Sequence, residues 1–222
     1  MPSYLENYDL GQTAGTPESG GPDLMAGRIL ARPDNHRCSA AYLDGGRRTA
    51  RGLPSSRRLA RLITSEITPT SAPVLELEPG TGVFTRALLS RGLREDQLIL
   101  VEFDPHLARR LERDYPDAWI VNVDAARLRQ INIVDGDPVG AVVSGLPLLL
   151  MSMRDRMVIL QFAFRHLRPG GSYYQLTYGP RCPVPRPVLE RMGLKAVRMG
   201  STWLNPLPAT VYRIRARRKQ QG

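Results

Sequence analysis

Apolar runs and amphipathic segments alternate along residues 74–178, and this alternation predicts an α/β fold. Four runs have the length and composition of buried strands, at residues 74–77, 98–102, 118–123 and 140–144. Helical spacing of apolar residues follows three of these runs, at residues 84–93, 105–115 and 152–167. Strands that alternate with helices in this way form a parallel sheet, so we expect a Rossmann-like arrangement.

The C-terminal part of the chain predicts a different kind of strand pairing. A Pro-Gly-Gly turn at residues 169–171 comes before a fifth strand at residues 172–178. Two more strands are expected around residues 195–199 and 210–217, where they can close the sheet edge as a hairpin. The predicted fold class is therefore α/β, a mostly parallel sheet with an antiparallel C-terminal hairpin.

The N-terminal part differs from the rest in composition. Residues 1–23 are rich in Gly, Pro, Ser and Thr, which is typical of a flexible arm. Residues 28–61 then carry nine arginines against two acids, Asp34 and Asp44. We therefore divide the chain into a flexible, basic arm at residues 1–50 and a folded domain at residues 51–222.

A basic amphipathic helix is expected at about residues 55–67, at the start of the folded domain. Pro54 and Ser55 form a helix start. One face of the helix is apolar and the arginines lie off that face: Leu59, Leu62, Ile63 and Ile67 against Arg57, Arg58 and Arg61. Such a helix either packs on the sheet or lies on an anionic lipid surface, and the sequence leaves both interpretations open.

Charge and cysteine usage narrow the possible partners. The formal net charge of +10 indicates an anionic partner, either nucleic acid or a membrane surface. Cys38 and Cys182 lie far apart and have no neighbouring Cys or His at zinc-site spacing, so neither a disulfide framework nor a metal site is predicted. The first thirty residues lack a signal-peptide core, and the apolar run at residues 146–151 is too short to span a bilayer. We expect a cytoplasmic protein.

The stretch at residues 74–83, Val-Leu-Glu-Leu-Glu-Pro-Gly-Thr-Gly-Val, is the strongest candidate for a binding site. Its glycines fall where a strand turns into a helix, so a ligand can lie against the backbone and face free N–H groups. The dinucleotide fingerprint G-x-G-x-x-G does not fit, because its third glycine position is Thr85. An ordinary glycine-rich loop is the alternative interpretation.

This stretch resembles the E-x-G-x-G-x-G motif of class I S-adenosylmethionine (SAM)-dependent methyltransferases. The resemblance implies that SAM contacts a continuous segment consisting of Glu76, Glu78, Pro79, Gly80, Thr81 and Gly82. The chain departs from the motif at Glu78, which replaces the usual first glycine. Its carboxylate would lie close to the carboxylate of SAM and should weaken binding.

The ends of the next three strands carry polar groups in the order found in this family. Ligands of open α/β sheets bind outside the carboxyl ends of the strands, so these groups are expected to lie together. The resemblance implies that Glu102 accepts hydrogen bonds from the ribose and that Asp124 accepts one from the adenine amino group. The implied cofactor contacts also include the neighbouring residues Phe103, Ala125, Ser144 and Gly145.

The loop after the fourth strand indicates which methyltransferases the chain resembles. Residues 143–148, Val-Ser-Gly-Leu-Pro-Leu, are similar to the Asn-Leu-Pro-Tyr loop of rRNA adenine dimethyltransferases, but they lack its asparagine and its aromatic ring. The Ser-Gly-Leu-Pro-Leu form is that of bacterial, rhizobial-type phospholipid N-methyltransferases. Residues 50–56, 175–180 and 205–209 are similar to the same family.

The resemblance implies SAM-dependent N-methylation of phosphatidylethanolamine and its mono- and dimethyl forms toward phosphatidylcholine. Tyr178 is the implied catalytic residue, because it ends a strand beside the loop at residues 144–148. The implied substrate contacts are Leu146, Pro147, Gln175, Arg186, Asn205 and Tyr212. A lipid acceptor predicts peripheral contact with the anionic inner face of the cytoplasmic membrane, and no nucleic-acid partner. An rRNA adenine or small-molecule methyltransferase, and a membrane-binding protein without catalysis, are the alternatives.

Overall fold

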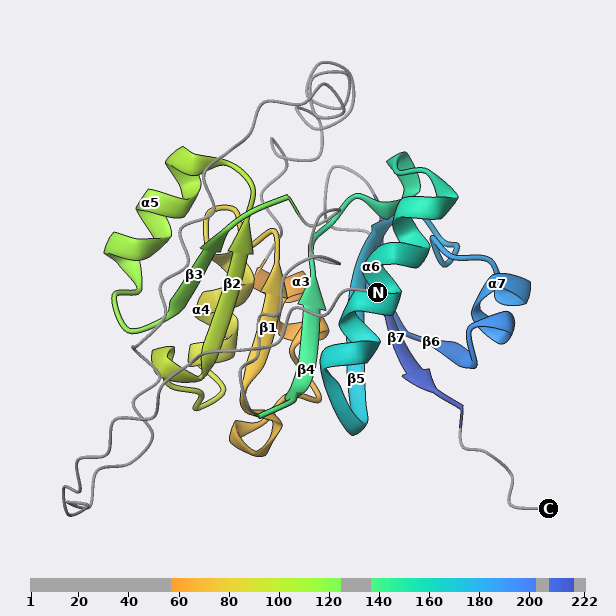
Figure 1. Ribbon diagram of the computed structural model, residues 1–222, viewed down its shortest axis with the longest axis horizontal. Coiled ribbons are helices and arrows are strands. Elements are labelled where there is room, and N and C mark those ends of the chain that lie inside the picture. Colours follow the sequence, from red (N-terminus) through yellow and green to blue (C-terminus); the bar gives the residue numbers. More distant parts are fainter. Residues whose placement is uncertain (1–56, 125–136, 203–207, 218–222) are drawn as a thin grey trace, which may run out of the picture. The chain divides into compact units, whose positions relative to one another are not determined.

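The computed structural model describes residues 57–124, 137–202 and 208–217 (Figure 1). These residues form a seven-stranded sheet with the order β3-β2-β1-β4-β5-β7-β6. The strands are β1 (Val74–Leu77), β2 (Leu98–Glu102), β3 (Trp119–Asn122), β4 (Val139–Ser144), β5 (Leu167–Tyr178), β6 (Leu194–Thr202) and β7 (Ala209–Ala216).

Strand directions confirm the fold class predicted from the sequence. β1 pairs in parallel with β2 and β4, while β3 and β5 extend the parallel part outward. β7 runs antiparallel to both β5 and β6, so the C-terminal hairpin closes the sheet at β6. The carboxyl ends of β1, β2 and β4 consequently point to the same edge of the sheet.

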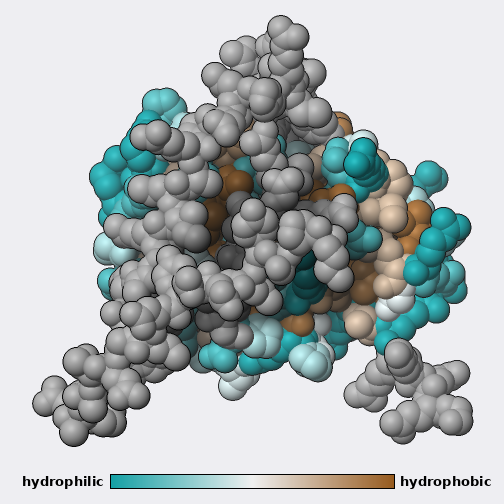
Figure 2. All heavy atoms as spheres, in the orientation of Figure 1, coloured by the Kyte–Doolittle hydropathy of each residue, from teal (hydrophilic) through white to brown (hydrophobic). Residues whose placement is uncertain are grey.

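Helices cover both faces of the sheet. Three of them contribute to one hydrophobic cluster on one face: α3 (Arg57–Ile63), α4 (Val83–Leu89) and α5 (Pro105–Asp114). Two more contribute to the cluster on the other face: α6 (Met153–His166) and α7 (Arg186–Arg191). Alternate strand residues divide between the clusters, as Leu75 and Val74 of β1 do, because neighbouring side chains of a strand point to opposite faces. Figure 2 shows the hydrophilic outer surface of α5.

Two boundaries in the C-terminal part differ from the prediction. β5 begins at Leu167, which pairs with Val139 of β4, and regular pairing resumes where Ser172 pairs with Ala141. The Pro-Gly-Gly segment is therefore an irregularity inside the strand, with Gly170 at a φ of 82°, and not a turn before the strand. Helix α7 was not predicted, because six residues are too few to show helical periodicity.

Helix α3 packs its apolar face into the protein core. Leu59 and Ile63 are fully buried, as is Ile67 beyond the helix, and the arginines of the helix are exposed. The helix ends at Ile63 and not at residue 67 as predicted, and the Thr64 hydroxyl donates to the Ala60 carbonyl at 2.8 Å. The expected arm at residues 1–50 and the expected helix start at residues 54–56 lie outside the described residues.

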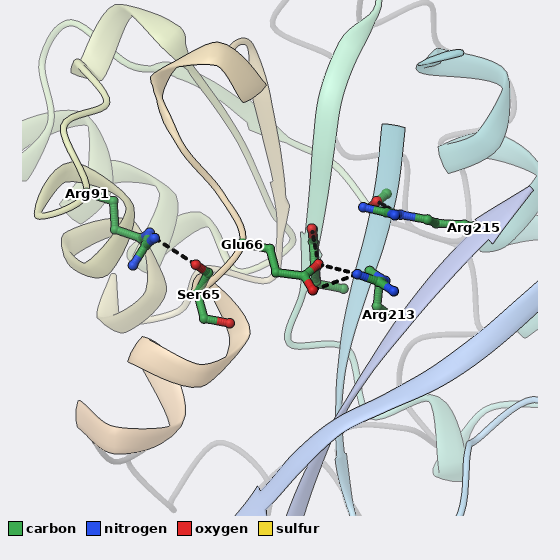
Figure 3. Close-up of polar contacts among 7 residues, drawn as sticks. Ser65, Glu66, Arg91, Arg213 and Arg215 are labelled. Carbon is green, nitrogen blue, oxygen red and sulfur yellow. Dashed lines mark hydrogen bonds and ion pairs between the residues drawn. The ribbon is translucent and has the colours of Figure 1, made fainter. Parts of the chain in front are cut away.

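The connection that follows α3 is held from two sides (Figure 3). Arg91 donates to the carbonyls of Ile67 and Ser65 at 2.6 and 2.7 Å. On the other side, Arg213 of β7 binds both carboxylate oxygens of Glu66 at 2.6 and 2.8 Å. Burial alone would raise the pKa of Glu66, but hydrogen bonds from Arg213 and from a tyrosine of β5 lower it. These contacts attach the α3 segment to the C-terminal hairpin.

Within the described part of the chain, no helix has the length and apolar character needed to cross a bilayer.

Because one face of α3 is buried, shortening a side chain on that face should destabilise the protein. Ile63→Ala should lower the free energy of unfolding by about 2–5 kcal/mol, because it removes buried methylene groups and leaves a cavity. Arg58→Ala on the exposed face is the matched control and should change it by less than about 0.5 kcal/mol. Urea unfolding measures both. A small loss for Ile63→Ala would contradict the packing described here.

Candidate active site

Backbone hydrogen bonds join three strand ends at the carboxyl edge of the sheet. The Glu78 N–H donates to the Val101 carbonyl of β2 at 2.9 Å. The Gly145 N–H donates to the Leu77 carbonyl of β1 at 3.0 Å. The glycine-rich turn after β1 therefore lies between the ends of β2 and β4.

The two glycines of the turn have backbone conformations that favour glycine. Gly80 and Gly82 have φ values of 58° and 75°. A Cβ added at Gly80 would meet no atom within 4 Å, so the backbone there faces open space. A Cβ at Gly82 would lie 2.7 Å from the hydroxyl oxygen of Tyr115, which packs against the turn from the end of α5. Tyr115 is a supporting residue that sequence reasoning missed.

Glu78 adopts the backbone conformation of the glycine that it replaces. Its φ is 57°, in the left-handed region, and it is the only described residue other than glycine with a positive φ. The turn therefore keeps the shape that a glycine would give it while carrying a carboxylate.

Glu102 at the end of β2 holds the turn through its carboxylate. Its Oε2 accepts the Gly80 N–H at 3.0 Å, and its Oε1 accepts the Asp104 N–H at 2.8 Å. The residue is 1% exposed, whereas its two donors, Gly80 and Asp104, are partly exposed, so both hydrogen bonds are partly buried. Asn122 of β3 donates to the carbonyls of Glu102 and Phe103 at 2.7 and 3.1 Å. In the sequence, Asn122 is distinguished only as a polar residue at the end of a predicted strand.

Glu76 is a fully buried acid on β1, and its Oε2 accepts the Thr85 hydroxyl at 2.8 Å. Burial raises the pKa of Glu76 to about 8, and the charge of Glu102 adds to this effect while the Thr85 hydrogen bond opposes it. Among the described residues, no hydrogen-bond partner reaches Oε1 of Glu76. Because buried polar atoms are usually paired, this oxygen is a candidate contact for a polar ligand.

The loop after β4 is supported from beneath by Gln175. This side chain is fully buried, and its Nε2 donates to the Leu146 carbonyl at 2.8 Å. The Tyr173 hydroxyl donates to the Gln175 Oε1 at 2.8 Å, which fixes the amide. The side chain of Gln175 therefore holds the loop, and the substrate contact expected for it stays a prediction. Ser144 is also fully buried and accepts the Leu146 N–H at 3.3 Å.

Arg156 of α6 connects the loop after β4 to the loop after β5. Its guanidinium donates to the carbonyls of Leu149 and Met151, both at 3.0 Å. A third hydrogen bond, at 2.6 Å, reaches the Pro183 carbonyl. Sequence reasoning missed this residue, because nothing local distinguishes it from other arginines on a helix.

The other predicted acceptor-side residues take different places. Tyr178 ends β5 and is half-buried, on the sheet face covered by α3 to α5. The Tyr212 hydroxyl donates to the Pro180 carbonyl at 2.6 Å, so it holds the loop after β5. The Arg186 side chain is 85% exposed and pairs with Glu190 on α7 at 2.8 Å. Leu146 is buried and Pro147 half-buried, and Asp124 follows β3.

Two of the predicted site residues, Ala125 and Asn205, lie outside the described residues. Thr177 of β5 was not predicted: it is 4% exposed, and its hydroxyl has no hydrogen-bond partner among the described residues. Within the same residues, no group of three or more His, Cys, Asp or Glu side chains could hold a metal ion.

Comparison with known proteins places the sheet in a large structural class. No protein-family model matches this sequence, and no curated protein sequence matches it. Among solved structures, the 23S rRNA methyltransferase ErmE aligns with a TM-score of 0.53 at 18% identity, over 75% of this chain and 70% of that one. The glycopeptide N-methyltransferase MtfA in complex with sinefungin aligns with a TM-score of 0.55 at 16% identity, over 72% and 93%. The chain has the fold of the SAM-dependent methyltransferases.

A second structure of MtfA is a complex with SAM itself, and aligns with a TM-score of 0.52 at 15% identity, over 72% and 93% of the two chains. The fold predicted from strand order and the glycine turn is thereby confirmed. At these identities the likeness does not extend to the acceptor, which has to be argued from the residues of this chain.

The pKa of Glu76 predicts a pH dependence of stability. Because the folded state keeps the proton up to about pH 8 while the unfolded state loses it near 4.5, stability should fall as pH rises between these values. The slope is up to about 1.4 kcal/mol per pH unit. The Glu76→Gln variant has no carboxyl group at this position to lose a proton. Its stability relative to the wild type should therefore increase from pH 5 to pH 8 in thermal unfolding. A difference independent of pH would show that Glu76 ionises near its ordinary pKa.

Proposed function

We propose that the chain is a SAM-dependent N-methyltransferase that acts on the amine of phosphatidylethanolamine and of its mono- and dimethylated forms. The observation that carries the cofactor assignment is the open space in front of Gly80, whose amide is bonded to the buried Glu102 carboxylate. Together with the unpartnered Oε1 of Glu76, this arrangement fits a donor that brings hydroxyl and ammonium groups.

The residues that would hold SAM follow from their places at the carboxyl edge. The segment from Glu76 to Gly82 would contact it after β1, Glu102 and Phe103 after β2, and Asp124 after β3. Ser144 and Gly145 border the same site after β4. When bound, SAM supplies a methyl group on a positively charged sulfonium.

The loop after β4 supports an acceptor other than a flipped adenine. Enzymes that hold a flipped base stack it on an aromatic ring and bond its edge. Here the corresponding positions are Gly145, which has no side chain to bond a base, and Leu148, which is 1% exposed and has no ring. The same loop exposes two leucines, Leu149 and Leu150, as suits a protein whose acceptor lies in a membrane.

An amine acceptor must lose a proton before it can attack a methyl group, and it must be held close to the donor. A positively charged donor nearby favours the neutral amine, because like charges disfavour the protonated form. Tyr178 at the end of β5 is our candidate for orienting the amine through its hydroxyl. Its ring could also bind the cationic methylated products by cation–π attraction.

A lipid acceptor places the protein at a membrane. We propose that it binds peripherally to the cytoplasmic face of the inner membrane, where anionic lipids attract its excess of 31 basic over 21 acidic side chains. The exposed arginines of α3 can contribute to this attraction, although the apolar face of the helix is used in the core.

A methylation assay tests the proposal directly. The protein is incubated with SAM carrying a labelled methyl group and with vesicles of phosphatidylethanolamine and phosphatidylglycerol, and parallel reactions contain total RNA or a small-molecule extract. We expect label in mono-, di- and trimethylated lipid, and a loss of turnover of about 10²-fold or more in Tyr178→Phe with normal SAM binding. Label in RNA or in small molecules alone would refute the lipid acceptor, and unchanged turnover would remove the Tyr178 hydroxyl from the mechanism.

Because Glu78 places a carboxylate in the glycine turn, we expect SAM to bind more weakly than it would with glycine at this position. Glu78→Gly should tighten SAM binding about tenfold, because it removes a negative charge close to the carboxylate of SAM. Glu78→Gln separates charge from backbone conformation: it should give most of the gain, since it removes only the charge. Isothermal titration measures both variants. Weaker binding by Glu78→Gln would mean that the carboxylate contributes to holding SAM.

A further inference from the structure

The exposed leucines after β4 are unusual for this protein. Across the described residues, three large hydrophobic side chains are exposed: Leu149 at 44%, Leu150 at 52% and Val197 at 43%. Two of the three are adjacent in sequence, in a short 3₁₀ helix at Leu148–Leu150. Single exposed apolar residues need no explanation, but a pair displayed beside a binding site does.

This leucine pair lies at the edge of the sheet that carries the candidate active site. The 3₁₀ helix follows the end of β4, where the Gly145 N–H donates to the Leu77 carbonyl. Leu77 is the last residue before the glycine turn. Any surface that touches the two leucines therefore approaches the acceptor side of the site.

The conformation of the leucine pair is fixed, not loose. The Leu150 N–H donates to the Pro147 carbonyl at 2.9 Å, which closes the turn. Arg156 holds the carbonyls on either side of Leu150, and Leu148 anchors the segment by burying its own side chain. The two leucines stay exposed because their neighbours are held in place.

The surroundings of the pair are basic. Arg154 is exposed in the first turn of α6, and Arg181 is exposed in the loop that Arg156 connects to this segment. The first turn of α6 also carries one acid, Asp155, which accepts the Ser152 hydroxyl, and Glu190 of α7 pairs with two arginines. Apolar side chains with a basic border complement an anionic bilayer surface.

We propose that the segment at residues 147–151 inserts Leu149 and Leu150 into the headgroup region of an anionic bilayer, with Arg154 and Arg181 on the lipid phosphates. The inference rests on the proposed lipid acceptor, and it specifies how the protein meets that lipid. Helix α3 cannot supply the insertion, because Leu59 and Ile63 are fully buried in the core. Insertion at the edge of the sheet brings the headgroups to the carboxyl ends of β4 and β5.

The test compares two exposed apolar sites of the same protein. The double variant Leu149→Ser with Leu150→Ser is compared with the control variant Val197→Ser. Val197 lies on β6 and is about as exposed as Leu149. Cosedimentation with vesicles of phosphatidylethanolamine and phosphatidylglycerol gives the affinity. We expect the double variant to bind about tenfold more weakly or worse, and Val197→Ser to bind as the wild type does. Thermal unfolding and SAM titration should be unchanged in both.

The inference is overturned if the double variant binds vesicles as well as the wild type does. It is also overturned if only Val197→Ser loses binding, because the contact would then lie on the hairpin. Short-chain phosphatidylethanolamine dispersed as monomers separates this inference from the proposed function. Both the wild type and the double variant should methylate it equally. If neither methylates any lipid while vesicle binding still depends on the leucine pair, the lipid contact stands and the proposed function fails.

Discussion

The candidate site depends on one interaction, the hydrogen bond from the Gly80 amide to the carboxylate of Glu102. It joins the turn after β1 to the end of β2, and because Glu102 is buried, losing this bond would leave a buried carboxylate without one of its donors. The backbone bond from Gly145 to Leu77 adds the end of β4. The open space before Gly80 exists because these three strand ends are fixed relative to one another.

The arginine-rich beginning of the described chain contributes to the structure in a different way. Helix α3 uses its apolar side chains to cover the sheet, and Glu66 after it pairs with Arg213 of the C-terminal hairpin. The segment therefore ties the two ends of the domain together. Exposed apolar side chains lie instead at Leu149 and Leu150, in the loop after β4.

Much of the fold and part of the site followed from local sequence. Buried strands and the glycine turn have short-range signatures, and Glu102 could be placed because carboxyl ends of parallel strands meet. Contacts between distant segments could not be predicted: Tyr115 packs on Gly82, and Arg156 reaches Pro183, without any local pattern. Burial was equally hidden: the sequence did not show that Gln175 holds the loop after β4 and that the Tyr212 hydroxyl holds the loop after β5.

Calorimetric titration of the protein with SAM, repeated with sinefungin as a competitor, is the most direct test of the site at the carboxyl edge. We expect saturable one-to-one binding, competition between the two ligands, and a loss of about tenfold or more in Glu102→Ala, with a cooperative unfolding transition retained. A folded wild-type protein that binds neither ligand at concentrations up to about 1 mM would contradict the assignment of this edge as a SAM site.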